Sequence, residues 1–177
     1  MKIKKKYLIA VFLIVILAIS SYFGYPYIKK LSEPKKVHYH AGLVLFVEDK
    51  KQDFSSFQYM NVRPCTLYRG NEEVDSDQDI QIEKAHLHDN VGDVVHVERE
   101  GGTWDDLFKN IRYDINYNNA VAILNGKEIK NFKSLRIKPY DSIIIFEGKN
   151  NISKHLSEGV TRQYIMQKEK KSDDCGS

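Results

Sequence analysis

The hydrophobic pattern of the chain begins with a long apolar stretch. Residues 7–28 include no charged side chain, and lysines flank this stretch on both sides. An α-helix needs about 20 apolar residues to cross a bilayer, and aromatic residues near the end of such a stretch are typical of a membrane interface. The pattern therefore predicts a transmembrane signal anchor over residues 1–30, followed by a polar linker over residues 31–36.

The lysines also predict the orientation of this anchor. A lysine cluster before the apolar stretch favours a cytoplasmic N-terminus, so we expect a single-pass protein of the cell membrane with an extracytoplasmic C-terminal domain. A cleaved signal peptide is the alternative, because Ala18 and Ser20 have the spacing of a cleavage site. The apolar stretch continues past these residues, which favours an uncleaved anchor. Both alternatives place the domain outside the cytoplasmic membrane.

Residues 37–150 combine strand patterns with one amphipathic helix pattern. The stretch "VHYHAGLVLFV" is rich in β-branched and aromatic residues and predicts a strand. "KAHLHD" and "DVVHVER" predict two more strands around a turn at Gly92. The acidic stretch over residues 71–83 is typical of a loop. In the helix pattern Thr103 is the expected N-cap, and one apolar stripe follows, which comprises Trp104, Leu107, Phe108 and Ile111.

Two further features complete the predicted sheet. Asn125-Gly126 between apolar residues is a strong hairpin signal, and the continuous apolar run Ile143–Phe146 indicates a central strand. We therefore predict an α+β domain over residues 37–150, in which a mixed β-sheet packs on one main helix. This order of elements resembles the β-grasp (ubiquitin-like) arrangement. Residues 151–177 are strongly charged and predict a helical C-terminal tail.

Charge and cysteine content narrow the possible functions. The chain has a net charge of +3, but residues 1–36 alone carry eight lysines and one glutamate. The remaining residues therefore have a net charge of −4, and a mildly acidic domain predicts that nucleic acid is not a partner. Cys65 and Cys175 could form a disulfide outside the cytoplasm or stay as two thiols. Because the chain has no CxxC motif, thiol–disulfide catalysis has no support.

Five of the six histidines occur in two short stretches and form the candidate site. Residues two apart in a strand point to the same face, so the HxH pair in each stretch can direct two imidazoles toward one ion. A hairpin across the turn would place His88 opposite His96. Imidazole with carboxylate partners suits zinc or copper(II). The predicted metal-binding residues are His38, His40, His86, His88, His96, Asp89 and Glu98.

The residues around these histidines also resemble a known family. The blocks are "HYHAGLVLFVEDKKQDF", "AHLHDNVGDVVHVEREGGTWDDLF" and "LNGKEI…LRIKPYDSIIIFEG". They are similar to an uncharacterised family of membrane-anchored proteins from small-genome, uncultivated bacteria and archaea. Its members pair an HxH with an HLHD…VIH(V)E block and a [TS]WxxFF-like helix, where this chain has Leu107-Phe108. The resemblance covers about residues 38–148, and it implies the organisation of the chain and its histidine site but no activity.

Three functions remain open for this histidine-rich domain. We favour a membrane-anchored, extracytoplasmic binding domain that holds zinc or copper(II) and is not an enzyme. The second interpretation is a metal-free envelope interaction or structural module, whose histidines form a polar cluster and whose partner is an envelope protein. The third is a metal-dependent hydrolase in which Glu98 or Asp89 acts as general base to a metal-bound water. A pocket that adjoins the histidines would favour the hydrolase.

Overall fold

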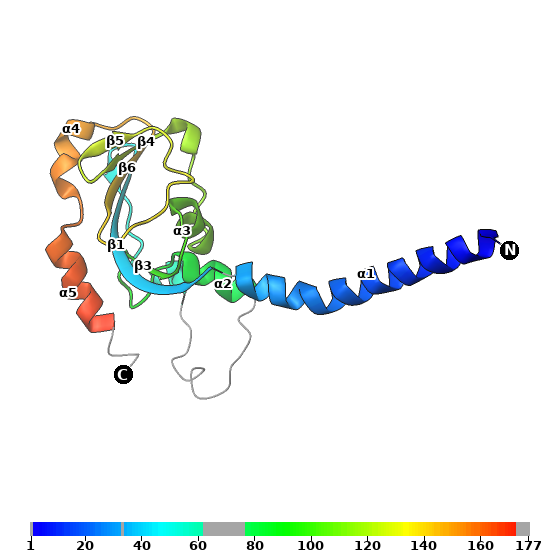
Figure 1. Ribbon diagram of the computed structural model, residues 1–177. Helices are drawn as coiled ribbons and strands as arrows, with labels where there is room; N and C mark the ends of the chain where they lie inside the picture. The colour runs from blue at the N-terminus through cyan, green and yellow to red at the C-terminus, as the bar shows by residue number, and fades with distance from the viewer. Residues whose placement is uncertain (1, 33, 62–76, 173–177) are drawn as a thin grey trace. The chain divides into compact units, whose positions relative to one another are not determined.

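The computed structural model describes residues 2–32, 34–61 and 77–172 (Figure 1). The chain divides into two compact units, Met1–Lys35 and Lys36–Ser177. The sequence analysis left open whether Cys65 and Cys175 form a disulfide or stay as two thiols, and both residues lie outside the described residues. The strands are β1 (Lys36–Val47), β2 (Lys50–Lys51), β3 (Val94–Arg99), β4 (Ala120–Leu124), β5 (Lys127–Ile129) and β6 (Ser142–Glu147). The α-helices are α1 (Lys2–Ser32), α2 (Asp77–Lys84), α3 (Trp104–Asn110), α4 (Ile152–His155) and α5 (Arg162–Ser172), and short 3-10 helices are η1 (Phe57–Tyr59), η3 (Tyr117–Asn119) and η4 (Leu156–Glu158).

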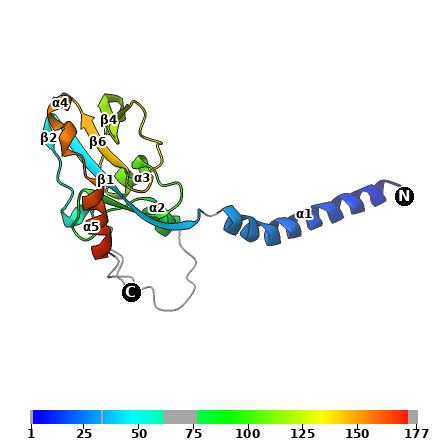
Figure 2. The ribbon, with the colours of Figure 1, turned by 60° about the vertical axis from the view of Figure 1, so that its left-hand side comes forward.

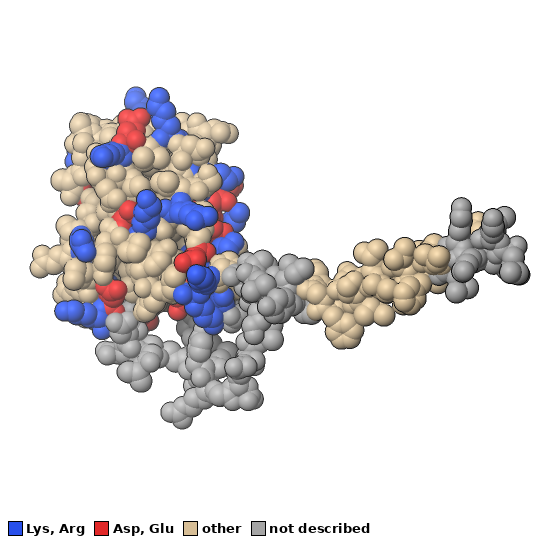
Figure 3. Space-filling view, in the orientation of Figure 1, with Lys and Arg blue, Asp and Glu red and all other residues tan. Residues whose placement is uncertain are grey.

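The N-terminal unit is formed by helix α1. The prediction of a transmembrane anchor over residues 1–30 is wrong, because within the described ranges no helix is both long and apolar enough to span a membrane. The run without a polar side chain covers only residues 8–19 before Ser20 and Ser21, which is shorter than the roughly 20 residues that a span needs. Ser20 Oγ donates a hydrogen bond to the Ile16 carbonyl, 2.7 Å away within the helix. Figure 3 shows the middle of α1 without charged side chains.

The second unit is α+β, with a curled mixed sheet. Strands β1 and β6 pair in parallel at its centre, and β4 and β5 continue it beyond β6 as antiparallel neighbours. On its other side β1 pairs antiparallel with both β3 and the short β2. The predicted hairpin at Asn125-Gly126 is confirmed: both residues have positive φ, 50° and 80°, as a type I′ turn between β4 and β5 requires. The predicted central strand is β6, which is buried from Ile143 to Phe146.

The two faces of β1 enter two different apolar clusters. Alternate side chains of a strand point to opposite faces, and Leu43 and Leu45 pack with α3, whereas Val44 and Phe46 pack with Ile165 of α5. Figure 1 shows α3 on one side of the sheet and α4 and α5 on the other. Turned by 60°, Figure 2 shows α5 alongside β1. The predicted packing on one main helix is therefore incomplete, because the C-terminal helices cover the second face.

Helix α3 begins where the sequence predicts. Thr103 is its N-cap and forms a capping box, in which Asp106 N donates to Thr103 Oγ1 at 3.2 Å and Thr103 N donates to Asp106 Oδ2 at 3.0 Å. Such a cap satisfies amide groups that have no partner within the helix. Trp104, Leu107 and Phe108 are buried in the apolar cluster on this face of the sheet. Helix α3 thus anchors the elements that lead to the histidines.

The acidic stretch before the second histidine pair is helical rather than a loop over Asp77–Lys84. The Asn110 side-chain amide of α3 donates to the carbonyls of Gln81 at 2.8 Å and Ala85 at 2.7 Å, so it satisfies the end of α2. Glu83 of α2 and Arg99 of β3 form an ion pair in which both side chains are buried. These contacts place the end of α2 beside β3.

Candidate metal centre

Five histidines gather on one sheet face from β1, β3 and the segment that follows α2, in which His86 makes an isolated bridge to β3. Register places His40 of β1 opposite His96 of β3, and an isolated bridge places His86 opposite His96 on the other side. Two reciprocal backbone hydrogen bonds of 2.9 Å join His86 and His96. Residues opposite each other in antiparallel pairs point to the same side, so these three rings form a row. His38 and His88, two residues along from His40 and His86, also have their rings against that of His96.

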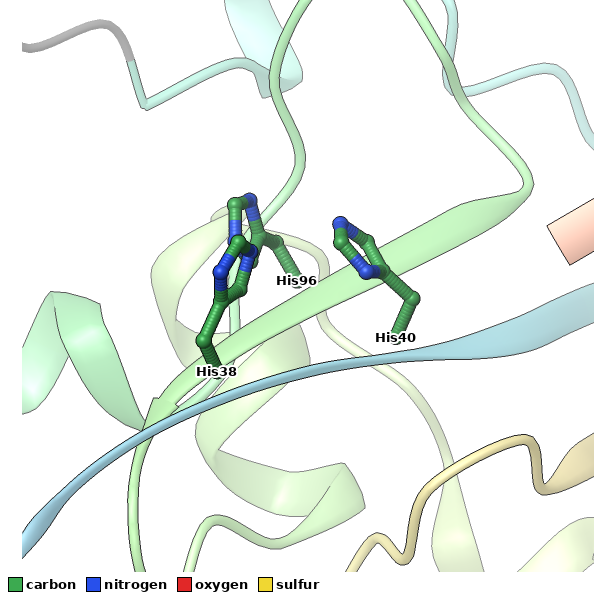
Figure 4. Close-up of side chains that lie close together, drawn as sticks. All are labelled: His38, His40 and His96. Atoms are coloured by element: carbon green, nitrogen blue, oxygen red, sulfur yellow. The ribbon is translucent and has the colours of Figure 1, made fainter. Parts of the chain in front are cut away.

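His96 lies at the centre of the cluster. Its ring centroid is 4.3 Å from that of His40, 4.5 Å from that of His38, 4.4 Å from that of His88 and 5.1 Å from that of His86. Figure 4 shows His38 and His40 of β1 gathered with His96 of β3. Two groups of three emerge, His38/His40/His96 and His86/His88/His96, and in each group one ligand atom per residue lies within 4.8 Å of the others.

Burial favours the neutral form of the inner imidazoles. The exposed fractions of His40, His86 and His96 are 2%, 6% and 7%, whereas His38 is exposed. Burial lowers the pKa of His96 far below its usual value, and the neighbouring histidines lower it further. Burial and the nearby His38 also lower the pKa of His40, against the opposing effect of the Glu169 carboxylate. At neutral pH His40 and His96 therefore keep a lone pair available for a metal ion.

The His86/His88/His96 group has oriented ring nitrogens. His86 Nδ1 donates a hydrogen bond to the Ile82 carbonyl at 3.1 Å, and His88 Nδ1 donates to Asp89 Oδ2 at 2.7 Å. Carbonyl and carboxylate oxygens only accept hydrogen bonds, so both rings hold their proton on Nδ1 and leave Nε2 as the lone-pair nitrogen. Metal-binding histidines commonly have such partners, which fix the tautomer and the direction of the ring.

The two nitrogens of His96 are in different situations. Nδ1 is in close contact with His88 Nε2. Nε2 is buried and, among the described residues, has no hydrogen-bond partner. A buried polar atom without a partner costs about 1–3 kcal/mol. A metal ion at Nε2 would remove this cost, because a ring nitrogen can coordinate a metal instead of accepting a hydrogen bond.

The two predicted carboxylates lie beside the cluster and belong to neither group of three. Asp89 contacts the far nitrogen of His88, so its place is that of an orienting partner. Glu98 is half-buried on β3, two residues from His96 and therefore on the same strand face. The predicted pairing of His88 with His96 is wrong by two residues, because His86 lies opposite His96. The turn runs from His88 to Val91, with positive φ at Asp89 and Asn90 rather than at Gly92.

Helix α5 contributes a site residue that the sequence analysis did not identify. Glu169 Oε1 lies 3.7 Å from His40 Nδ1, and its other oxygen accepts a 3.0 Å hydrogen bond from the Tyr140 hydroxyl. The available signal was the helical spacing from the fully buried Ile165, since residues four apart share a helix face. Glu169 follows that apolar position by one turn and lies beside His40.

Comparisons with protein-family models, curated proteins and solved structures find no match to this chain. The resemblance to a family with similar histidine blocks, and the resemblance to the β-grasp arrangement, therefore stay predictions. The geometry of the cluster and the chemistry of imidazole are the observations on which a function can be argued.

A hollow of about 420 Å³ lies between the loop after the histidines and helix α5. Its lining includes Phe54, Asn90, Val91, Tyr164 and Lys168. None of the five histidines lines it. The hollow therefore does not bring a substrate-sized space against the candidate ligands, which a hydrolase would require.

Proposed function

We propose that this domain binds a zinc or copper(II) ion through its histidine cluster, and that binding rather than catalysis is its function. One observation carries the proposal. In the group His86, His88 and His96, the Nδ1 atoms of His86 and His88 each donate a hydrogen bond to an oxygen, so Nε2 is the lone-pair nitrogen of both rings. The ligand nitrogens of the three imidazoles lie within 4.8 Å of one another, so side-chain rotation toward a common point would let them bind one ion.

The chemistry of the ligands narrows the choice of metal. Calcium and magnesium prefer oxygen ligands, and the described groups of three contain only imidazole nitrogen. Imidazole suits zinc and copper(II), and zinc lies about 2.0–2.1 Å from each coordinating nitrogen. The partners of His86 and His88 resemble those of the usual outer shell of such sites, in which a carboxylate or carbonyl accepts the distal N–H.

The experiment is metal content by mass spectrometry of the full chain, purified without a histidine tag. We expect stoichiometric zinc or copper after incubation with either ion, and its loss in the variant His86→Ala/His88→Ala. The matched control is His155→Gln, which removes the one histidine outside the cluster. We expect this control to keep its metal. Circular dichroism of each variant shows whether the domain is still folded.

A second measurement tests the same proposal through stability. A ligand that binds only the folded state raises the free energy of unfolding, by about 2.7 kcal/mol at a concentration 100 times its dissociation constant. Zinc should therefore raise the melting temperature of the wild type and of His155→Gln, but not that of His86→Ala/His88→Ala. If the folded wild type takes up neither ion, the metal proposal fails and the metal-free interaction module replaces it.

A further inference from the structure

We infer that the cluster holds two metal ions rather than one, with His96 as the ligand that they share. This inference rests on the proposed function and assigns it a second metal position. The inner position is formed by His86, His88 and His96, and the outer position by His38, His40 and His96. In each of these groups the ligand atoms lie within 4.8 Å of one another, and His96 belongs to both.

The two nitrogens of His96 are divided between the positions. Nδ1 contacts His88 Nε2 and so belongs to the inner position. Nε2 is the buried nitrogen for which the described residues offer no hydrogen-bond partner. Since the two nitrogens lie on different edges of the imidazole ring, one ion cannot use both. The unsatisfied Nε2 therefore remains for a second ion, which His38 and His40 would also bind, since their ring centroids lie 4.5 and 4.3 Å from that of His96 (Figure 4).

The outer position has its own orienting carboxylate. Glu169 faces His40 Nδ1 at 3.7 Å and is held by the Tyr140 hydroxyl at 3.0 Å. In the inner position Asp89 lies closer to its histidine and accepts a hydrogen bond from His88 Nδ1 at 2.7 Å. Each position thus has one histidine whose Nδ1 faces a carboxylate. Such partners orient a ligand and strengthen its bond to the metal.

The two positions differ in their exposure to solvent. His38 is exposed, whereas His86 is buried and the side chain of His88 is 22% exposed. His40 is buried as well, so the exposed His38 is the outer ligand that solvent can reach, and its release would let the outer ion exchange more readily than the inner ion. Metal should fill the inner position first and leave the outer position first.

The ring proton of His96 can be followed as the two ions bind. A neutral imidazole has one N–H and one lone pair, and in the metal-free protein the proton of His96 is on Nδ1, which faces the lone-pair Nε2 of His88. When the first ion binds Nδ1, this proton moves to Nε2 of the same ring. The second ion replaces the remaining ring proton, which passes to solvent, and the resulting imidazolate joins the two ions. No oxidation or reduction is involved.

The test is a titration of the full chain with copper(II), followed by electron paramagnetic resonance. We expect two copper ions per chain, and a signal that grows with the first equivalent and then decreases with the second, because an imidazolate couples the two unpaired electrons. The variant His38→Ala/His40→Ala should bind one ion and keep an uncoupled signal. His96→Ala should show no coupled signal at any copper concentration.

A conservative variant tests the outer position without removing a ligand. Glu169→Gln should lower the affinity for the second ion about 10–100-fold and leave the affinity for the first ion unchanged. The matched control is Glu158→Gln, which alters the carboxylate 2.5 Å from Nδ1 of His155, outside the cluster, and should change neither affinity.

The outcomes separate this inference from the function on which it rests. One ion per chain that requires His86 and His88 would overturn the second position and leave the proposed function intact. No ion at all would overturn both. Two ions with the full signal of two isolated coppers, or a coupled pair that survives His96→Ala, would overturn the shared ligand.

Discussion

Acidification should destabilise the metal-free domain through its buried histidines. Burial lowers the pKa of both His40 and His96 in the folded state, whereas in the unfolded chain a histidine titrates near its usual pKa of about 6.5. Below that pH the unfolded state binds more protons than the folded state, so the free energy of unfolding decreases as pH falls. Above pH 6.5 both states are neutral at these rings and the effect vanishes.

The size of the effect follows from this difference in proton binding. One pH unit below 6.5, protonation of a single unfolded histidine lowers the free energy of unfolding by about 1.4 kcal/mol. His96 should contribute this full amount, because its pKa in the folded state is lowered furthest. His40 should give less, because the Glu169 carboxylate opposes the lowering. The total at pH 5.5 is therefore between about 1.4 and 3 kcal/mol, out of about 5–15 kcal/mol for a typical domain.

Urea unfolding at pH 7.5, 6.5 and 5.5, in the presence of a chelator, measures this effect. Trp104 is fully buried and is the one tryptophan of the chain, so its fluorescence reports the transition. The variant His96→Asn should lose about 1.4 kcal/mol less than the wild type between pH 7.5 and 5.5. The two proteins share all other titrating groups, so the difference between their losses of unfolding free energy reports His96. Equal losses in the two proteins would show that His96 is protonated in the folded state and would refute the reasoning.

Three substitutions test the packing that positions the cluster. Gly42→Ala brings the new Cβ into a steric clash with the Val160 side chain. It should lower the free energy of unfolding in urea by about 1–3 kcal/mol, and an unchanged urea midpoint would contradict this contact. Glu83→Gln leaves the buried Arg99 without its carboxylate charge and should cost about 3–5 kcal/mol. In a double-mutant cycle, adding Arg99→Met should recover part of that loss. Thr103→Ala removes the capping box of α3 and should cost about 1 kcal/mol by thermal unfolding, whereas Thr103→Ser should cost little.

Local signals predict several elements of the fold correctly. The capped start of α3, the Asn125-Gly126 turn and the central strand β6 each depend on a few neighbouring residues. The pair His38 and His40 of β1 is of the same kind, because the period of a strand determines which residues share a face. These features need no knowledge of distant parts of the chain. The strand predicted over residues 84–89 is wrong, because this segment makes only an isolated bridge at His86.

Features that depend on distant parts of the chain are the ones that the sequence did not predict. The pairing of β3 with His86 rather than His88 depends on the length of the loop after His88 and on the helix α2 before it. The role of Glu169 depends on how α5 packs, because its helical spacing from Ile165 indicates a shared face but not that this face lies against His40. The error at α1 has another cause, since a stretch free of charge is not the same as a stretch that is apolar enough to span a membrane.

Helix α5 connects the histidine cluster with the second apolar cluster of the domain. Along one face of β1 the side chains change from His38 and His40 to Val44 and Phe46. A single helix covers both parts, with Ile165 in the apolar cluster and Glu169 beside His40. A metal ion bound by His40 would strengthen the attraction of Glu169 to the site, because the ion adds positive charge near the carboxylate. By linkage, metal binding and the packing of α5 should then stabilise each other. This arrangement gives the C-terminal segment a physical part in the site, although no residue of α5 belongs to either group of three histidines.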